Sequence, residues 1–526
     1  MKYTNHNIFK YIFALVVIAL IIGAVYILYY SNKKDVEVDE EYEVVNEVTG
    51  QISIVENMKM GISSFDTMNP LLTKNKEIVN INKLVFEPLV AVTSDYKTEN
   101  CLAKSIEKIS DVQYKIKVDT NTKWQDGSSL ISKDIEYTVS ILKSIDSIYS
   151  ANVQAISNIE ILDSETAIIN LNYPVQFFEY YLDFPIVSSA YYMNEDFINS
   201  SKIPIGTGMY KIASIDNDNV LLIRNDRWRL IKEKTPKTQS ITIHKYNVVG
   251  EAYNAFKMGN VDIINTYLTN YQDYVGTMGY NKKEYVARDF DFVSLNCNDS
   301  ILSDKSVRQA LTLGISKENI VSSVLGNRKV ASYSPLAYGS YLYNREGELE
   351  YNQDNAKKVL EENGWVFTND RWQKTIDGYV RKLILNLVVC NDNEERINVA
   401  NNIRDQLDLI GIKVNVVRVN RDRYNQYLRE KNYQLLLTGV INSINPDFSY
   451  FYGENNLANY NNQEVKDNIY NLDKIKENQK IINDDCPYIG LYRNKGIVLL
   501  NANVGGNFEP NSYFTYYNFN EWFRQQ

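Results

Sequence analysis

The side chains that most often perform nucleophilic or metal-assisted catalysis are scarce in this sequence. Two histidines, His6 and His244, occur in 526 residues and lie far apart. A Ser-His or Cys-His pair would depend on His244, which lies in an alternating segment, 240–246, that is typical of a strand and favours a structural role. The four cysteines have no CxxC spacing, so a zinc knuckle is not indicated. They are Cys101, Cys297, Cys390 and Cys486.

Other patterns that carry chemistry are also missing from the sequence. It contains no GxSxG, P-loop or HExxH motif. The adjacent acids at 361–362 and 484–485 are typical of solvated helix faces, because acid–base pairs must oppose each other across a cleft. We therefore predict that the protein is not an enzyme, and we assign no catalytic residue, no cofactor and no metal ligand. Cys297 and Cys390 each follow a predicted strand. A disulfide between them is conceivable, but free buried thiols are preferred, since cysteine often fills a core as a small residue.

A run of twenty uncharged residues, 11–30, is the strongest local pattern in the chain. At about 1.5 Å per residue, it is long enough to cross a bilayer core as a helix. No A-x-A-like cleavage site follows it, so we predict an uncleaved signal anchor, with a cleaved signal peptide as the alternative. The positive charges flanking the run are nearly balanced and leave its orientation open. The acidic segment 31–50 is predicted to be an extended linker.

The composition and the length limit the possible partners and the number of structural units in the rest of the chain. Lys and Arg number 56 against 65 Asp and Glu, a formal charge of −9, and 44% of the residues are hydrophobic. The acidic balance argues against nucleic acid as a partner, because phosphate binding relies on clustered basic side chains. The length predicts two to four structural units with sizeable cores.

Strand and helix patterns alternate through the body, which predicts an α/β class containing parallel strands. Apolar alternation predicts the strands, and stripes at helical spacing predict the helices. A helix is expected to run into an apolar segment over 80–90, and Ser132 is expected to be the N-cap of the helix 132–143. The expected strands are 51–60, 113–118, 167–171, 220–223, 290–295, 383–389 and 413–419, and the other expected helices are 307–315, 317–325 and 394–409.

Several ordered segments resemble the family 5 extracellular solute-binding proteins, which include the oligopeptide, dipeptide and nickel receptors of ABC importers. Gln125 and Met209 stand where the family usually has histidine and proline. The similarity runs from about Met58 into the C-terminal region. The segments are LVFEPL at 84–89, KWQDGSSL at 123–130, IPIGTGMY at 203–210, DKSVRQAL at 304–311, and the stretches 351–365 and 403–416.

Some residues of these segments also have plain structural explanations. Gly206 and Gly208 would supply the backbone freedom of a tight loop. Arg308 is expected to form a buried structural pair, because a charge beside an apolar helix face needs a partner. Trp124, Trp228 and Trp365 are expected to anchor cores.

The resemblance implies a two-lobed, periplasmic-binding-protein-like (type II) fold after the N-terminal transmembrane helix. Lobe I is expected over 51–287, with an inserted subdomain at about 75–200 and a C-terminal return over 491–526. Lobe II is expected over 288–490.

The resemblance also implies a function. A membrane-anchored, extracellular monomer would capture a peptide or other small solute by lobe closure and deliver it to ABC permease subunits. The alternative is a membrane-tethered sensor of the same fold that signals to a partner.

The loop 438–447 carries the candidate binding residues Asn442, Asn445 and Asp447. In peptide receptors of the family, an aspartate four residues before the loop's proline pairs with the ligand's α-ammonium group, and Asn442 holds this position here. Asparagine lacks the charge that strengthens such a bond. Asp447 or Glu454 is a possible replacement, and a polar turn without a ligand role is the alternative.

A second group of candidates lies in the loop 61–70, which would face the cleft in this family. Ser63 and Ser64 would supply hydrogen bonds, and Phe65 would supply a stacking surface. A solvent-exposed turn around Asp66 is the alternative. On a lobe II helix, 394–409, Arg396 and Arg404 are further candidates for a ligand carboxylate, although most such arginines are solvated.

Overall fold

The computed structural model describes residues 54–525, apart from 269, 338 and 377. The predicted membrane anchor at 11–30 and the predicted acidic linker at 31–50 lie outside the described residues and stay predictions. Within 54–525, we find no helix that combines the length and the apolar character needed to cross a membrane.

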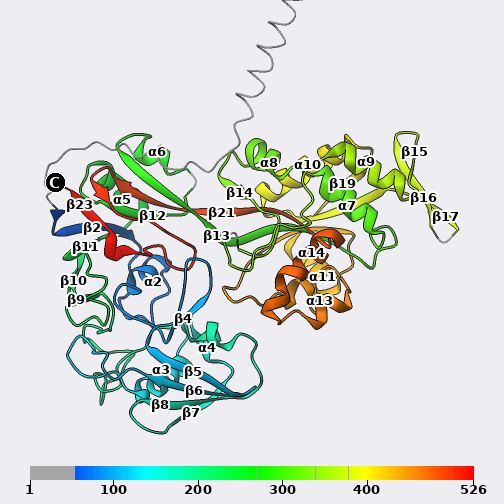
Figure 1. Cartoon of the computed structure of the whole chain (residues 1–526). Helices are drawn as coiled ribbons and strands as arrows, with labels where there is room; N and C mark the ends of the chain where they lie inside the picture. The colour runs from blue at the N-terminus through cyan, green and yellow to red at the C-terminus, as the bar shows by residue number, and fades with distance from the viewer. Residues whose placement is uncertain (1–53, 269, 338, 377, 526) are drawn as a thin grey trace, which may run out of the picture. The chain divides into compact units, whose positions relative to one another are not determined.

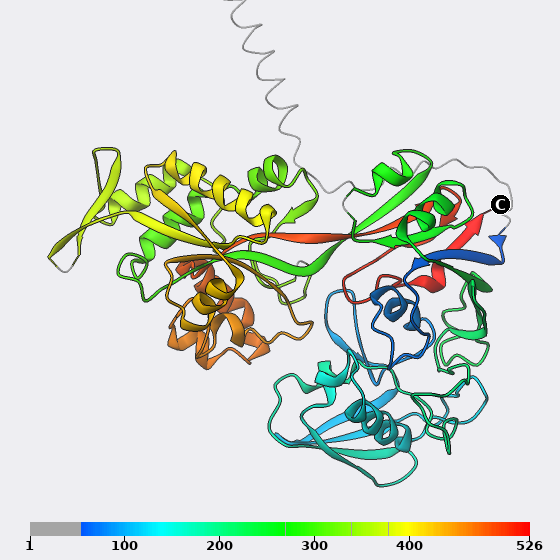
Figure 2. The same ribbon diagram turned by 180° about the vertical axis from the view of Figure 1, so that it is seen from behind.

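One mixed sheet of eleven strands runs through the described chain. Its order is β19-β18-β20-β13-β21-β12-β2-β11-β10-β9, with β14 (Lys329–Ala331) added beside β21. The two long central strands, β13 (Tyr280–Leu295) and β21 (Tyr488–Asn501), pair antiparallel. Figures 1 and 2 show them passing side by side from one end of the sheet toward the other. They therefore connect the two groups of strands and helices described next.

The C-terminal part contains β18 (Ile384–Cys390), β19 (Lys413–Val419) and β20 (Leu435–Ile441). Strands β18 and β19 are parallel and flank helix α10 (Glu394–Asp408), as predicted. The sheet is mixed overall because β13 runs antiparallel to β20. The other elements are α7 (Lys305–Gly314), α8 (Lys317–Asn319), the π-helical turn η2 (Ile320–Val324), α9 (Gln353–Glu362), β15 (Val366–Thr368), β16 (Arg371–Ile376), β17 (Tyr379–Lys382), α11 (Arg421–Glu430), α12 (Ser449–Tyr452), α13 (Gln463–Asp467), η3 (Leu472–Lys474) and α14 (Ile475–Asp485).

The N-terminal part is built on β2 (Asn57–Ser63), which lies between the parallel strands β11 (Ser240–Tyr246) and β12 (Ile263–Thr266). The end of the chain returns here, because β23 (Phe523–Gln525) pairs with both β1 (Ile54–Val55) and β22 (Val504–Gly505). The other elements are α2 (Lys76–Asn82), β9 (Tyr210–Ile215), β10 (Asn219–Arg224), α5 (Val249–Lys257), α6 (Gln272–Val275) and η4 (Phe519–Glu521).

A separate antiparallel sheet, β5-β6-β8-β7, forms the subdomain, with its own core around Trp124. Helix α3 (Ser132–Ser144) contributes Ile135, Val139 and Leu142 to this core, and their spacing places them on one face of the helix. The other elements are β3 (Val90–Val92), β4 (Thr98–Asn100), β5 (Ala103–Ser110), β6 (Gln113–Val118), α4 (Ser150–Val153), β7 (Ile156–Ile161), β8 (Thr166–Leu171) and η1 (Phe178–Leu182).

Two local predictions are wrong. The N-cap of α3 is Ile131 rather than Ser132, and the Asp134 side chain accepts a hydrogen bond from the Ile131 amide at 3.0 Å. Neither Gly206 nor Gly208 has a positive φ. Both are required by close approaches instead, since a Cβ at Gly206 would clash with the Val85 carbonyl oxygen and a Cβ at Gly208 would lie 2.7 Å from the Leu84 carbonyl oxygen.

Three further predictions concern buried side chains. Trp124, Trp228 and Trp365 are buried, as predicted. Arg308 is also buried, but its guanidinium donates to the carbonyls of Leu302 and Asp485 rather than to a carboxylate. The four cysteines are free thiols, which is the preferred alternative for Cys297 and Cys390.

Candidate functional site

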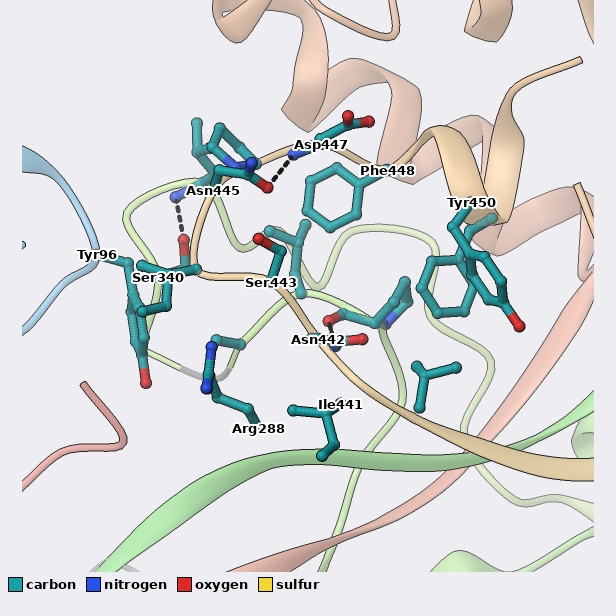
Figure 3. Close-up of a pocket in the computed structure, with 18 of the residues that line it drawn as sticks. Tyr96, Arg288, Ser340, Ile441, Asn442, Ser443, Asn445, Asp447, Phe448 and Tyr450 are labelled. Carbon is teal, nitrogen blue, oxygen red and sulfur yellow. Dashed lines mark hydrogen bonds between the residues drawn. The ribbon is translucent and has the colours of Figure 1, made fainter. Parts of the chain in front are cut away.

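A cavity of about 380 Å³ lies between the C-terminal part and the subdomain. We call it the first chamber. The segment 440–451, which follows β20, lines one side together with the loop 335–342. Tyr96 and Tyr180 line the opposite side. Figure 3 shows Tyr96 on a separate ribbon facing the segment that carries Asn442 to Tyr450. Residues distant in sequence thus enclose one space.

Arg493, on β21, holds the loop beneath this chamber in place. Its side chain is 1% exposed and lines the cavity. The guanidinium donates to the carbonyls of Ser334 at 3.0 Å, Pro335 at 2.8 Å and Leu336 at 3.1 Å, and to Ser332 Oγ at 3.0 Å. Burial lowers the pKa of Arg493 to about 10. The arginine therefore fixes the backbone of 332–336 and keeps its positive charge at neutral pH.

A second chamber, also of about 380 Å³, lies between the N-terminal part, the subdomain and the start of the C-terminal part. Lys83 from the end of α2 and Asp183 from the end of η1 line it. Arg288, Ile441 and Ile444 line both chambers. Because the two chambers share these walls, we treat them as one continuous cleft.

Arg288 enters the cleft at an irregularity in β13. The register between β13 and β21 shifts between Val286 and Phe290, and Arg288 lies inside this interval. Such bulges bend a strand and redirect the side chain. Figure 3 shows Arg288 beneath the segment that carries Ile441 and Asn442. Its guanidinium makes no ion pair with any residue in the described part of the chain. It is therefore a half-buried positive charge available to an anion.

The predicted loop brings Asn442, Asn445 and Asp447 together on the wall of the first chamber. The Asn442 amide nitrogen donates to the Pro335 carbonyl, which ties the two lining segments together. Asn445 donates to the Tyr181 hydroxyl at 3.2 Å. It also accepts from the Asp447 amide at 3.4 Å (Figure 3). Asp447 Oδ1 accepts from the Ser449 amide at 2.9 Å. Among residues 54–525, the Asp447 carboxylate has no cationic partner.

Ser63, Ser64 and Phe65 line neither chamber of the cleft. The carbonyls of Ser63 and Ser64 accept hydrogen bonds from Asn75 Nδ2, at 3.2 and 2.8 Å. The Lys245 ammonium lies 3.9 Å from the centroid of the Phe65 ring. The six candidate residues are therefore not brought together, and a ligand role for these three stays a prediction.

The other charged candidates have partners within the protein. Arg396 pairs with Asp291 at 2.7 Å, Arg404 with Asp405 at 2.8 Å, and Glu454 with Lys466 at 3.4 Å. None of the three candidates lines either chamber.

Sequence reasoning missed the residues that the subdomain and the central strands bring to the cleft. Lys83, Asp183, Tyr96 and Tyr180 carry no pattern that separates them from ordinary surface residues. One feature of the sequence could have pointed to Arg288 as a cleft residue. It stands at the predicted boundary between the lobes, two residues before a predicted strand. A charge at such a junction is exposed to any cleft that the junction creates.

Glu77, in the first turn of α2, is expected to make stability fall as the pH rises. Its Oε2 is buried without a partner among the described residues. Burial raises the pKa of Glu77 to about 7, with the Ser63 backbone opposing this more weakly. The folded state therefore binds more protons than the unfolded state between pH 4.5 and about 7, and stability is lost across that window. We expect Glu77→Gln to melt well above the wild type at about pH 8 and close to it at about pH 4 in calorimetry.

Glu464→Gln is the matched control for this experiment. Glu464 occupies the same position of α13, after an asparagine N-cap, but it is exposed. We expect its substitution to leave the pH profile of melting unchanged. An unchanged profile in Glu77→Gln would contradict the prediction.

The sequence and the structure were compared with known proteins. Residues 97–462 match the description "Bacterial extracellular solute-binding proteins, family 5 Middle". The oligopeptide-binding protein AppA of Bacillus subtilis (strain 168) is 24% identical over 447 residues, which cover 80% of this chain and 79% of that protein.

Two solved structures illustrate the similarity of fold. The murein tripeptide-binding protein MppA, in an unliganded open form, aligns with a TM-score of 0.77 and 15% identity over 90% of this chain and 98% of that one. A nickel ABC transporter protein from Bacillus halodurans aligns with a TM-score of 0.74 and 18% identity over 89% of this chain and 100% of that one. The described fold is therefore an α/β fold that matches periplasmic binding proteins.

Proposed function

Since the chain belongs to the bacterial extracellular solute-binding proteins of family 5, we propose that it captures a peptide or a similar small zwitterionic solute in the cleft. One observation carries the choice of ligand. The cleft offers a carboxylate, Asp447, and a guanidinium, Arg288, neither of which forms an ion pair with another described residue. A peptide with free ends carries an ammonium group at one end and a carboxylate at the other. Each would meet a group of opposite charge in the cleft. Charge-assisted hydrogen bonds are the strong ones, so such a ligand would gain at both ends.

The positions of the two charges suit this assignment. Figure 3 places Asp447 and Arg288 on opposite sides of the segment that carries Asn442 and Ser443. Asp447 would accept the α-ammonium group, in place of the aspartate that the family usually has at the position of Asn442. Arg288 would donate to the carboxylate. Tyr96, Tyr180 and Tyr450 add aromatic surface to the first chamber, which suits varied side chains.

Capture would involve closure of the two lobes predicted from the sequence, 51–287 with 491–526 and 288–490, with the subdomain at about 75–200. Strands β13 and β21 extend through both sides of the cleft, so they supply the connection about which a hinge motion would turn. Hydrogen bonds already cross the first chamber, from the Tyr341 amide to the Asp95 carbonyl at 3.0 Å and from Asn445 to Tyr181. A ligand that adds contacts to both sides would favour the closed arrangement.

Thermal denaturation with a panel of ligands tests capture. A solute that binds the folded state alone stabilises it by about 2.7 kcal/mol at a concentration one hundred times its Kd. We expect unblocked peptides of two to five residues to raise the melting temperature of the full-length protein by several degrees, whereas neutral sugars leave it unchanged. No shift with any peptide would exclude the proposed ligand class.

Delivery to a permease is the second half of the proposal. The protein would act as a monomer outside the cell, held by the segment 11–30, and would pass its ligand to an ABC permease. Deleting the gene should then abolish uptake of a labelled peptide that the purified protein binds. Normal uptake after deletion, with an altered transcriptional response to the peptide, would support the sensor alternative. Protease added to intact cells should degrade the body of the chain.

A further inference from the structure

A third cavity, of about 170 Å³, adjoins the cleft within its N-terminal side. We call it the side chamber. It lies between α2, the hairpin β3–β4, the turn 228–234 and the C-terminal segment 513–520. The residues that it shares with the second chamber form its mouth, and they are Val79, Lys83, Tyr149, Asp183 and Tyr513. These five side chains therefore stand between the two chambers, and a ligand group from the cleft would enter the side chamber past them.

The walls of the side chamber are mainly apolar and aromatic. Phe86, Met209, Trp228 and Phe514 line it. Its nearest buried carboxylate, Glu87, is already satisfied by the Trp228 indole nitrogen at 3.1 Å, the Thr207 hydroxyl at 2.9 Å and the guanidinium of Arg229 at 3.3 Å. Glu99 and Lys234 border the chamber but are exposed to solvent. The size is sufficient for a ring, because a cavity of about 150 Å³ holds benzene.

Asn82, the last residue of α2, is a buried polar residue in this lining, which also includes the half-buried Asn518 and Asn520. Its side chain is 4% exposed and lines the chamber. Within residues 54–525, neither Oδ1 nor Nδ2 of this buried amide has a hydrogen-bond partner. Leaving a buried amide unsatisfied is unfavourable. Asn82 is therefore a neutral amide in the chamber wall whose buried donor and acceptor are both left unsatisfied by the described residues.

The charges at the mouth are already engaged by the protein. The Lys83 ammonium donates to the Tyr513 carbonyl at 2.6 Å and lies 3.2 Å from the centroid of the Tyr513 ring. Asp183 accepts from Asn152 Nδ2 at 2.6 Å. Burial lowers the pKa of Lys83 to about 7, against the attraction of Asp183. A charged group that entered would lose its hydration without gaining an unpaired opposite charge.

We propose, on the basis of the peptide-binding function above, that the side chamber is the specificity pocket of the cleft. It accepts one ligand side chain that is apolar or aromatic along its length and ends in a neutral hydrogen-bonding group, which Asn82 binds. The phenol of tyrosine and the amide of glutamine have this chemistry. Phenylalanine and methionine match their sizes but leave the Asn82 amide unsatisfied, so they are discriminated against.

Calorimetric titration of the full-length protein in mild detergent tests this. The probes are pentaalanine peptides that carry tyrosine, phenylalanine, glutamine, methionine, glutamate or lysine at one position at a time. We expect one position at which tyrosine binds at least tenfold more tightly than phenylalanine and glutamine at least tenfold more tightly than methionine. In Asn82→Leu, both preferences should disappear while the apolar peptides still bind. Glutamate and lysine should bind more weakly than glutamine at that position.

Two further variants keep the result interpretable. Asn363→Leu replaces an exposed asparagine at the end of α9 and should retain both preferences. Met209→Trp fills the chamber and should remove the preferences without depending on Asn82. Equal binding of tyrosine and phenylalanine peptides at every position, a preference that survives in Asn82→Leu, or tighter binding of a charged side chain at the selective position would each overturn the specificity pocket. Failure of every peptide to bind the wild type would instead overturn the proposed function.

Discussion

Replacing Asp447 with asparagine is expected to weaken binding of an unblocked peptide by about 10- to 100-fold. The carboxylate lines the first chamber, and its one hydrogen bond within the described residues comes from the Ser449 amide. The substitution keeps the shape of the side chain but removes the charge that would hold an α-ammonium group. A hydrogen bond to a charged group contributes about 1.5–3 kcal/mol, which corresponds to this change in Kd. Calorimetric titration measures it.

Blocked peptides identify which end of the ligand Asp447 binds. An N-acetylated peptide has no ammonium group, so it should bind the wild type weakly and Asp447→Asn no worse. The reciprocal experiment uses Arg288→Gln with a C-terminally amidated peptide. Asp473→Asn, an exposed carboxylate in η3, is the matched control and should bind as the wild type does. Equal loss of affinity for the free and the acetylated peptide in Asp447→Asn would contradict the assignment of the ammonium group.

Replacing Arg493 with methionine is expected to destabilise the protein by about 3–5 kcal/mol. Methionine fills much of the same volume but donates no hydrogen bond. The carbonyls of Ser334, Pro335 and Leu336 would lose the donor that now lies within 3.1 Å of each. The Pro335 carbonyl would keep the Asn442 amide as a donor, so the loss falls mainly on the carbonyls of Ser334 and Leu336. At about 2–4 °C per kcal/mol, the melting temperature should fall by about 10 °C.

Two control variants distinguish the loss of the hydrogen bonds that Arg493 donates from the loss of any arginine. Arg421→Met removes an arginine that is 54% exposed and pairs with Asp392, and it should cost less than about 1 kcal/mol. Arg493→Lys keeps the charge with fewer donors, so it should fall between the wild type and Arg493→Met. If Arg493→Met and Arg421→Met melted at the same temperature, the network would have no role in holding the loop 332–336.

Local patterns were sufficient for many secondary elements. The alternation over 113–118 predicted β6 within its observed bounds, and the strand–helix–strand pattern of 383–419 predicted the parallel pair β18 and β19 with α10 between them. These succeed because the residues that define the pattern are neighbours in sequence. The helix expected over 317–325 also forms, with one difference in its geometry. The α-helical residues of α8 (Lys317–Asn319) continue directly into the π-helical turn η2 (Ile320–Val324).

The ends of helices, and the reason why a given position requires glycine, were less predictable. A serine before a helical stripe favours an N-cap, yet Ser132 lies one residue inside α3 and donates to the Asp163 carbonyl instead. Gly208 looked like a turn residue, but it is needed because the backbone near Leu84 passes too close for a side chain. The sequence contains no information on such an approach between segments more than one hundred residues apart.

Sequence alone was enough to establish the α/β class, the similarity to family 5 and the loop that carries Asn442, Asn445 and Asp447, because each depends on residues in a short or ordered stretch. The tertiary structure alone decided the rest of the cleft. Lys83, Asp183 and Arg288 approach this loop only after the subdomain and the central strands have packed, and the same burial lowers the pKa of Lys83 and leaves the amide of Asn82 without a partner in the described chain. Burial and proximity between distant segments are properties of packing, so no local pattern records them.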